Sequence, residues 1–459
     1  MHPLLAQENE PSRPIWLVRD RTWAEVAEKL PASARAFAKA QGFDAKAGRH
    51  CVLPDAEGGI GGVVFGLEDS SAKHIDPFLP GKLATVLPEG VYRFETVPSD
   101  PTLATLGWLL GSYSFDRYRK GTTKAVRLVV PHGVDHDEVA RIAHAVAMGR
   151  DLINTPANDL GPDGIEAAAR HLAERHGAAF ASVVGNDLLK QNFPMIHAVG
   201  RASQTAPRLI DLVWGRDDAQ KVTLVGKGVA FDTGGLDIKP SASMLLMKKD
   251  MGGAAAALAL ADMIMGAGLP VRLRVLVPAV ENAISGASFR PGDILPSRKG
   301  ITVEIGNTDA EGRLVLGDAL ALADEESPDL VVDFATLTGA ARVALGPELP
   351  PFYTEDDALA AEIERCGRAV NDPVWRLPLW QPYAKQLDSK VADTNHVGGP
   401  MAGSIIAALF LRKFVTAAKA HVHFDIFAWT NAAKPGRPEG AEVQGARLMY
   451  QFLKERYGT

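Results

Sequence analysis

The segment ITVEIGNTDAEGRLVLGDALALADEE, residues 301–326, decides the fold that we expect for this chain of 459 residues. Residues 301–305 carry β-branched side chains at alternate positions and stop at Gly306, a pattern that predicts a strand running into a loop. Residues 315–326 are rich in Ala and Leu and predict a helix. A strand, a polar loop and a helix in this order are typical of an open α/β sheet, which binds ligands beyond the carboxyl ends of its strands.

The loop of this segment, Asn307–Leu314, concentrates charge between the strand and the helix. It places the carboxylates of Asp309 and Glu311 and the guanidinium of Arg313 at alternate positions. Taken alone, these residues also fit a solvated charged turn. Whether these charged residues form a functional site therefore depends on the side chains that face them in the folded chain.

The chain after residue 158 continues the alternation of strands and helices. Several of the expected strands are apolar throughout, as a sheet that is covered on both faces requires. The predicted strands are 209–213, 222–225, 271–277, 301–305, 330–334 and 422–427, and the predicted helices are 254–265, 315–326, 358–370 and 404–417. We therefore expect a doubly wound α/β fold with a mostly parallel sheet.

A smaller α/β domain is predicted before this sheet. Its expected strands are 15–18, 62–66 and 125–130, and its expected helices lie within 23–40 and 103–112. A helix over 137–154 then meets prolines, asparagines and a glycine in Asn154–Pro162, which predict a boundary. The expected organisation is an N-terminal α/β domain at 1–136, a connecting helix and linker at 137–158, and a catalytic domain at 159–459.

The composition is that of a soluble globular protein, with 46% hydrophobic and 23% charged residues. The formal net charge of -6 gives no general attraction to nucleic acid or to anionic lipid. The two cysteines encode neither a disulfide framework nor a thiolate metal cluster. The first residues lack the pattern of a signal peptide, and the apolar stretch 252–261 is shorter than the ~20 residues of a membrane span, which predicts a cytoplasmic protein.

A glycine-rich stretch, residues 226–240, follows the predicted strand 222–225. A dinucleotide fingerprint would need a third glycine where Phe231 stands. A Walker A loop would need Ser or Thr after Lys227, which is followed by Gly228. Both phosphate-binding interpretations therefore fail, and we expect a glycine-flexible loop that carries charged side chains.

Charged residues gather at the expected strand ends and helix starts of the catalytic domain. They are Lys227, Asp232, Lys239, Asp250, Asp309 and Glu311. Four carboxylates in one place need compensating cations, and two divalent ions would balance them. Each of these residues taken singly fits an ordinary surface, loop or cap position, so only their joint occurrence supports a metal site.

Three stretches, Val225–Ala255, Asn307–Leu314 and Asp333–Ala340, resemble the M17 leucine aminopeptidase (cytosol aminopeptidase) family. The resemblance covers the C-terminal two thirds of the chain, and the N-terminal region matches loosely. It implies a metal-dependent aminopeptidase that hydrolyses the N-terminal peptide bond of short peptides. It also implies a homohexamer whose active sites face an interior cavity.

The resemblance assigns expected roles to individual residues. It implies that Lys239 polarises the scissile carbonyl and stabilises the oxyanion, and that Arg313 anchors a bicarbonate ion as general base. The implied metal ligands are Lys227, Asp232, Asp250, Asp309 and Glu311, with Asp232 and Glu311 bridging two divalent ions. The implied substrate-binding residues are Met247, Thr336, Leu337 and Gly339.

These implied roles are chemically consistent with one another. A water that bridges two metals has its pKa lowered from 15.7 towards ~7, which supplies a hydroxide nucleophile at neutral pH. Lys227 ligates a metal only as the neutral amine, so we expect metal and burial to push its pKa far down. Carboxylate and amine ligands suit Zn or Mn, with Mg and Co as alternatives. A free amino terminus that binds one metal would restrict cleavage to the first residue.

The C-terminal region departs from the family pattern. The family tends to carry a Gly-x-Thr-Gly turn beside the pocket for the first side chain, whereas this chain has GAEVQGAR over Gly440–Arg447. Met247 predicts an apolar first residue, but a Glu442 near the pocket would put a preference for leucine in doubt.

Other functions remain as alternatives at this point. Some relatives of the family bind DNA as architectural proteins, and Arg117, Arg119 and Lys120 would suit such a surface, although the acidic net charge opposes it. A catalytically silent oligomer conflicts with the full set of ligand positions. A dinuclear phosphoesterase would usually use histidine ligands, and the twelve histidines form no His-Glu-x-x-His motif, so we expect surface or core positions for them.

Overall fold

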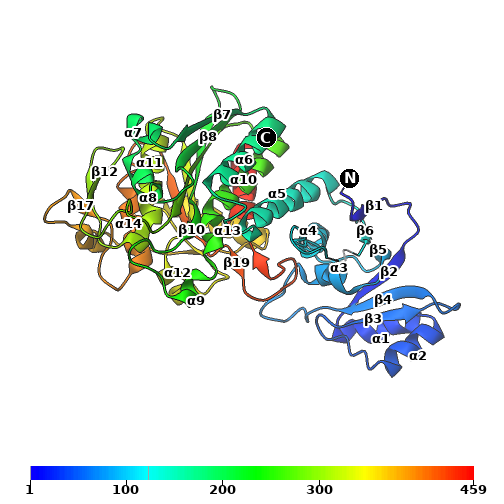
Figure 1. The fold of residues 1–459 in the computed structure, drawn as a ribbon. Helices are drawn as coiled ribbons and strands as arrows, with labels where there is room; N and C mark the ends of the chain where they lie inside the picture. The colour runs from blue at the N-terminus through cyan, green and yellow to red at the C-terminus, as the bar shows by residue number, and fades with distance from the viewer. Residues whose placement is uncertain (1, 122–123, 459) are drawn as a thin grey trace. The chain divides into compact units, whose positions relative to one another are not determined.

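The computed structural model describes residues 2–121 and 124–458, which divide into two compact units. Unit 1 contains Met1–Ala147 and Asn431–Glu439, and unit 2 contains Met148–Thr430 and Gly440–Thr459 (Figure 1). The division falls inside helix α5 (His136–Asn154), so this one helix belongs to both units. The return of Asn431–Glu439 to unit 1 is a feature that the sequence analysis did not predict.

Unit 1 is built on a six-stranded sheet in the order β1-β6-β5-β2-β4-β3. All neighbouring strands are parallel except β3 and β4, which are antiparallel. The strands are β1 (Leu5–Ala6), β2 (Arg13–Val18), β3 (His50–Pro54), β4 (Ile60–Gly66), β5 (Gly90–Phe94) and β6 (Val126–Val129). The helices are α1 (Asp20–Lys29), α2 (Ala32–Ala40), α3 (Leu83–Val86) and α4 (Pro101–Gly111), with a short 3₁₀ helix η1 (Leu79–Lys82). The predicted α/β class of this region is confirmed.

The helical stretch expected over residues 23–40 consists of two helices. Helix α1 ends before Leu30, whose backbone is extended at φ -77° and ψ 150°. Pro31 follows Leu30, and a proline disfavours helical backbone in the residue before it. The break therefore has a local cause that the sequence already contains.

Unit 2 is built on a nine-stranded sheet that runs β16-β15-β18-β14-β9-β11-β8-β7, with β10 also paired to β11. The central pairs β18-β14, β14-β9, β9-β11 and β10-β11 are parallel, and the strands beyond β11 are antiparallel. The strands are β7 (Ala179–Val184), β8 (Arg208–Trp214), β9 (Gln220–Gly226), β10 (Gly228–Asp232), β11 (Val271–Asn282), β14 (Leu330–Ala335), β15 (Pro351–Tyr353), β16 (Trp375–Arg376) and β18 (His421–Asp425). The predicted mostly parallel sheet is confirmed.

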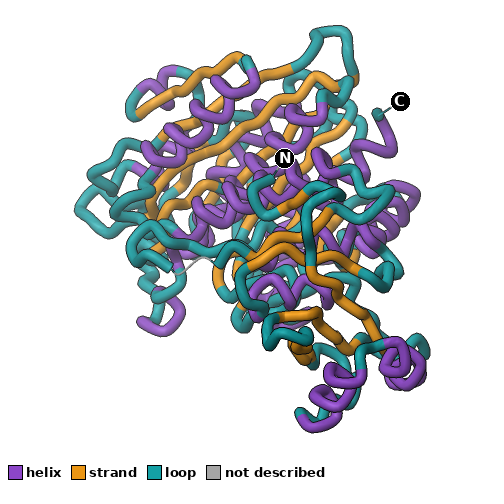
Figure 2. The backbone as a smooth tube through the Cα atoms, turned by 90° about the vertical axis from the view of Figure 1, so that its right-hand side faces the viewer, coloured by secondary structure: helices purple, strands orange, loops and turns teal. Residues whose placement is uncertain are grey.

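Helices cover both faces of the large sheet, as a doubly wound fold requires (Figures 1 and 2). Helices α6, α10 and α15 pack on one side, and α8, α11 and α14 pack on the other. The helices of unit 2 are α6 (Pro162–His176), α7 (Asp187–Lys190), α8 (Pro194–Gly200), α9 (Ser241–Met244), α10 (Gly252–Ala267), α11 (Glu311–Asp324), α12 (Gly339–Leu345), α13 (Asp357–Ala369), α14 (Gly403–Arg412) and α15 (Ala446–Tyr457). Short 3₁₀ helices are η2 (Met247–Met251), η3 (Thr308–Ala310) and η4 (Gln381–Leu387).

Helix α10 is the central core helix of unit 2. Together with η2 it forms an apolar helical segment of 21 residues, Met247–Ala267, which is longer than the sequence analysis indicated. Its length and hydropathy would suit a membrane span, but 89% of its apolar window is buried inside the protein. Because it contacts β9, β14 and α15, we interpret it as a core helix.

Three expectations near the predicted site need correction. The strand expected over 301–305 is β13 (Thr302–Glu304), which lies outside the large sheet, in a small sheet with β12 (Ile294–Pro296) and β17 (Thr394–Asn395). The loop expected over 226–240 contains strand β10, because residues 228–232 find a partner in the extended β11. Helix α11 begins at Glu311 instead of residue 315, so the second half of the expected loop, Asn307–Leu314, is helical. A further two-stranded sheet joins β19 (Trp429–Thr430) to β20 (Gly440–Ala441).

Candidate functional site

The charged residues that the sequence analysis singled out lie where strands end and helices begin. Lys227 directly follows β9, and Asp232 is the last residue of β10. Asp250 lies in η2, immediately before α10. Asp309 lies in η3, and Glu311 is the first residue of α11. The fold thus brings five residues from three separate stretches of the chain, 227–232, 250 and 309–311, to one edge of the sheet.

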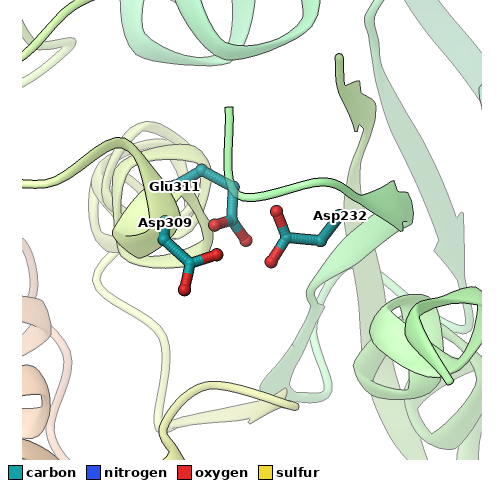
Figure 3. A group of neighbouring side chains, drawn as sticks. All are labelled: Asp232, Asp309 and Glu311. Carbon is teal, nitrogen blue, oxygen red and sulfur yellow. The ribbon is translucent and has the colours of Figure 1, made fainter. Parts of the chain in front are cut away.

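Three carboxylates, those of Asp232, Asp309 and Glu311, point towards one another (Figure 3). One oxygen atom from each lies within 4.8 Å of the other two. Asp232 and Glu311 are buried, whereas Asp309 is partly exposed. Asn282, which the strand register places beside Asp232, donates from Nδ2 to Asp232 Oδ1 at 2.8 Å and so fixes that carboxylate. This spacing of oxygen ligands suits a metal ion.

Lys227 is enclosed by acceptors from three elements. Its Nζ lies 2.7 Å from Asp250 Oδ2 and 3.0 Å from Glu311 Oε1, and it donates to the carbonyl oxygen of Thr336 at 2.9 Å. The side chain passes directly beneath the first turn of α11, where a Cβ on Gly312 would lie 2.6 Å from Lys227 Cε. Glycine at position 312 therefore provides the room that Lys227 occupies.

Lys239 lies on the more open side of the carboxylates. Its Nζ is 2.8 Å from Asp232 Oδ2 and also forms an ion pair with Asp309 Oδ1. The Lys239 side chain is 13% exposed, compared with 3% for Lys227. Lys239 is thus the lysine that faces the solvent-accessible part of the site.

The crowding of charges shifts the ionisation of the whole cluster. Burial, with the nearby charge of Asp232, raises the pKa of Glu311 to about 8 and that of Asp309 to about 6. Burial lowers the pKa of Lys227, but the charges of Asp250, Glu311 and Asp232 outweigh it and hold that pKa above the ordinary lysine value. The low pKa that we expect for a metal-bound Lys227 therefore requires a cation that neutralises these carboxylates.

The donor set fits divalent cations. Four carboxylates face two ammonium groups, so two negative charges exceed the lysine charges once all four carboxylates are ionised. Glu311 Oε2 is buried and has no hydrogen-bond partner among residues 2–121 and 124–458, and the only partner of the buried Oε1 there is the ammonium group of Lys227, in an ion pair at 3.0 Å. Buried carboxylate oxygens without donors are costly unless a cation contacts them. An acidic metal site is the arrangement that satisfies them.

Arg313 is held on the same side of the site by a residue that the sequence analysis missed. Its Nη1 donates to the carbonyl oxygen of His396 at 2.6 Å, while its buried Nε has no hydrogen-bond partner among the described residues. Burial lowers the pKa of Arg313 to about 10, which leaves the guanidinium charged at neutral pH. A buried cation with an unused donor fits a small anion such as bicarbonate.

A cavity of about 830 Å³ opens over these charged residues. Its wall includes the four residues predicted to contact substrate, Met247, Thr336, Leu337 and Gly339. Thr336 Oγ1 donates to Asp250 Oδ1 at 2.8 Å, so Thr336 also positions a carboxylate. The backbone N–H of Leu337 donates to Asp425 and is directed into the protein. Glu311 lies beneath the wall, with 1% exposure.

Glu442, from the turn that departs from the family pattern, does not line this cavity as the structure describes it. It is buried, and its Oε2 accepts a hydrogen bond from Arg150 Nη2 at 2.7 Å. Glu442 therefore does not affect the preference for leucine as the first residue through direct contact with the pocket.

Several other residues of the site were missed because their contacts are distant in sequence. Asn282 contacts Asp232, His396 contacts Arg313 and Asp425 contacts the backbone of Leu337. The pair His421 and His423 binds Asp333, at 2.7 Å and 2.6 Å, inside the sheet. The only sequence signal for the contacts of all these residues is that each polar side chain stands next to apolar strand residues.

Comparison with known proteins gives matches over both units. A model described as the cytosol aminopeptidase family, catalytic domain, matches residues 147–450, and a model of the M17 aminopeptidase N-terminal domain matches residues 14–131. A "Probable cytosol aminopeptidase" from Roseiflexus castenholzii is 40% identical over 391 residues, which span 82% of this chain and 80% of that protein.

Solved structures match over nearly the whole chain. The crystal structure of a cytosol aminopeptidase from Coxiella burnetii has a TM-score of 0.94 and 44% identity, and covers 100% of both chains. The bottromycin maturation enzyme BotP in complex with Mn has a TM-score of 0.87 and 32% identity, and covers 98% of this chain and 100% of its own.

Proposed function

The chain belongs to the M17 cytosol aminopeptidase family and is an aminopeptidase and a metallopeptidase, and from this premise we propose the finer details of its reaction. The proposed reaction is hydrolysis of the N-terminal peptide bond of short peptides. The observation that carries the proposal is the cluster of Asp232, Asp309 and Glu311, with oxygens within 4.8 Å of one another, in a group of four carboxylates that faces two ammonium groups.

Two divalent ions would occupy this cluster in the proposed enzyme and supply a bridging hydroxide as nucleophile. Asp232 and Glu311 would bridge them, with Lys227 and Asp250 completing the tighter site and Asp309 the exchangeable one. Zn or Mn are the proposed ions, with Mg and Co as alternatives, and the manganese complex of a relative supports Mn.

The remaining charged residues would act directly on the substrate. Lys239, which is partly exposed and held 2.8 Å from Asp232, would polarise the scissile carbonyl and stabilise the oxyanion. Arg313 would hold a bicarbonate ion as general base, which its unused buried Nε supports. Met247 on the cavity wall supports an apolar first side chain.

The name of the relatives supports a cytoplasmic location, and the homohexamer stays a prediction.

We expect protein stripped with a chelator to lose hydrolysis of leucine p-nitroanilide and to regain it with Mn or Zn. The physical reason is that only bound cations neutralise the carboxylate cluster and activate water at neutral pH. Release of p-nitroaniline measures the activity, and N-acetyl-leucine p-nitroanilide, which lacks a free amino group, should stay uncleaved. Full activity without metal, or equal cleavage of the blocked substrate, would contradict the proposal.

Metal affinity should rise with pH between about pH 6 and 8.5. Below its pKa of about 8, Glu311 holds a proton that competes with a cation, and the proton leaves as the pH rises. Lys227, whose pKa is raised, must also release a proton to ligate. Titration calorimetry with Mn²⁺ in two buffers of different ionisation enthalpy measures both the affinity and the protons released. A pH-independent affinity without proton release would contradict this expectation.

A further inference from the structure

Lys249 is a buried lysine that the proposed reaction does not use. It lies in η2 between Met247 and Asp250, lines the substrate cavity and is only 3% exposed. Among the residues that the structure describes, no carboxylate forms an ion pair with its ammonium group. The other two lysines of the cavity, Lys227 and Lys239, are each paired with two carboxylates.

The surroundings of Lys249 leave its charge available to a ligand. Its Nζ lies 4.7 Å from the centre of the Phe427 ring, and the Arg342 guanidinium lies 5.7 Å from the same ring. One acid whose charge acts on Lys249 is Asp425, but Asp425 forms an ion pair with Arg342 at 2.8 Å. Asp425 also accepts hydrogen bonds from the backbone of Leu337 and from Thr338.

The second acid near Lys249 is also committed. Asp250 Oδ2 lies 2.7 Å from Lys227, and Asp250 Oδ1 accepts a hydrogen bond from Thr336. Asp425 is therefore paired with Arg342 and Asp250 with Lys227, and among the described residues neither carboxylate forms an ion pair with Lys249. The contact with the aromatic ring offsets only part of the cost of burying an unpaired ammonium group.

We propose that Lys249 binds a carboxylate on the side chain of the substrate's first residue, so that the enzyme accepts N-terminal aspartate or glutamate besides apolar residues. The inference rests on the proposed aminopeptidase function and extends its first-residue preference. Met247 supplies an apolar wall for methylene groups, and Lys249, two residues further on, supplies a charged end to the same cavity. A carboxylate there completes an ion pair that the protein itself leaves open.

The test compares Lys249→Met with Lys248→Met on p-nitroanilides of glutamate, aspartate and leucine. Lys248 is the matched control, because it donates to the carbonyl oxygen of Asn154 at 2.6 Å and lies outside the cavity wall. In Lys249→Met we expect the ratio of kcat/KM for the acidic substrates to that for leucine to fall at least about tenfold. The ratio should not change in Lys248→Met. Inhibition of the wild-type enzyme by free glutamate relative to free leucine gives a second measurement.

Each outcome decides the proposal. Hydrolysis of leucine but of neither acidic substrate by the wild type, or an unchanged ratio in Lys249→Met, would overturn it while leaving the aminopeptidase function intact. A variant that instead loses its preference for Leu-Gly over Leu-glycinamide would assign Lys249 to the peptide's C-terminal carboxylate and would also overturn it. Absence of hydrolysis of all three anilides by metal-loaded wild type would overturn the aminopeptidase function and this inference together.

Discussion

Replacing Glu311 by glutamine should reduce metal-dependent hydrolysis of leucine p-nitroanilide by at least about 10³-fold. Charge stabilisation by metal ions is worth several kcal/mol in a transition state, and each 1.36 kcal/mol corresponds to a factor of ten in rate. Glu311 is the most deeply buried carboxylate of the convergent cluster, and among the described residues the only partner of its two Oε atoms is the ammonium group of Lys227. An uncharged amide at this position would weaken metal binding, which calorimetry with Mn²⁺ measures together with the rate.

The same substitution should stabilise the metal-free protein at alkaline pH. The folded pKa of Glu311, about 8, lies above its ordinary value of 4.5, so ionisation of this buried group opposes folding. The penalty is absent below pH 4.5 and is fully developed above pH 8. The melting temperature of Glu311→Gln in chelator should therefore exceed that of the wild type at pH 8.5, with a smaller difference at pH 6.

The matched control for this experiment is Glu325→Gln. Glu325 lies just after α11 and is paired with Arg298 at 2.7 Å, with 53% of its side chain exposed. Exposed ion pairs contribute little to stability, so this control should change neither activity nor metal affinity. Retained activity in Glu311→Gln with metal bound would remove Glu311 from the metal site.

Replacing Lys239 by methionine should lower kcat for leucine p-nitroanilide about 10²- to 10³-fold, the usual effect of removing an oxyanion-stabilising donor. Lys239 is the more exposed of the two clustered lysines and pairs with Asp232 and Asp309. Its removal leaves those two carboxylates without their ammonium partner, so metal affinity should be retained or should increase. Activity assays combined with calorimetry test both expectations.

Metal affinity distinguishes the metal-binding role proposed for Glu311 from the oxyanion-stabilising role proposed for Lys239. Glu311→Gln should lose activity together with metal, whereas Lys239→Met should lose activity with the metal retained. A loss of metal in Lys239→Met would instead assign Lys239 to holding the carboxylates in place. Replacement by arginine keeps the charge and should recover part of the rate.

The residues of the proposed site were selected from the sequence by their joint occurrence at strand ends and by the resemblance to the family. Lysines and aspartates after apolar strands, such as Lys227 and Asp232, are conspicuous against the pattern of the sheet. The local boundaries were less predictable. Glu311 was expected in a loop, yet it begins α11, which aims its carboxylate at Lys227 from the first turn of a helix.

Contacts between distant segments escaped prediction for a different reason. Lys249 precedes Asp250 directly, but its burial beside Phe427 depends on a segment nearly two hundred residues away. A position near the pocket was considered for Glu442, but Glu442 forms an ion pair with Arg150, on α5. Neither the contact of Lys249 with Phe427 nor that of Glu442 with Arg150 leaves a periodic or local signal in the sequence.

The sequence by itself determined the alternation of strands and helices, the doubly wound fold and the residue types of the proposed metal site. These depend on side-chain periodicity and on the charges carried at strand ends, which are local properties. Only the tertiary structure decided that β10 joins the sheet beside β11, that residues 307–314 follow a strand of a separate small sheet, and that no carboxylate of the described residues forms an ion pair with Lys249. Strand pairing and charge compensation depend on which distant groups meet, and those meetings are fixed only when the core packs.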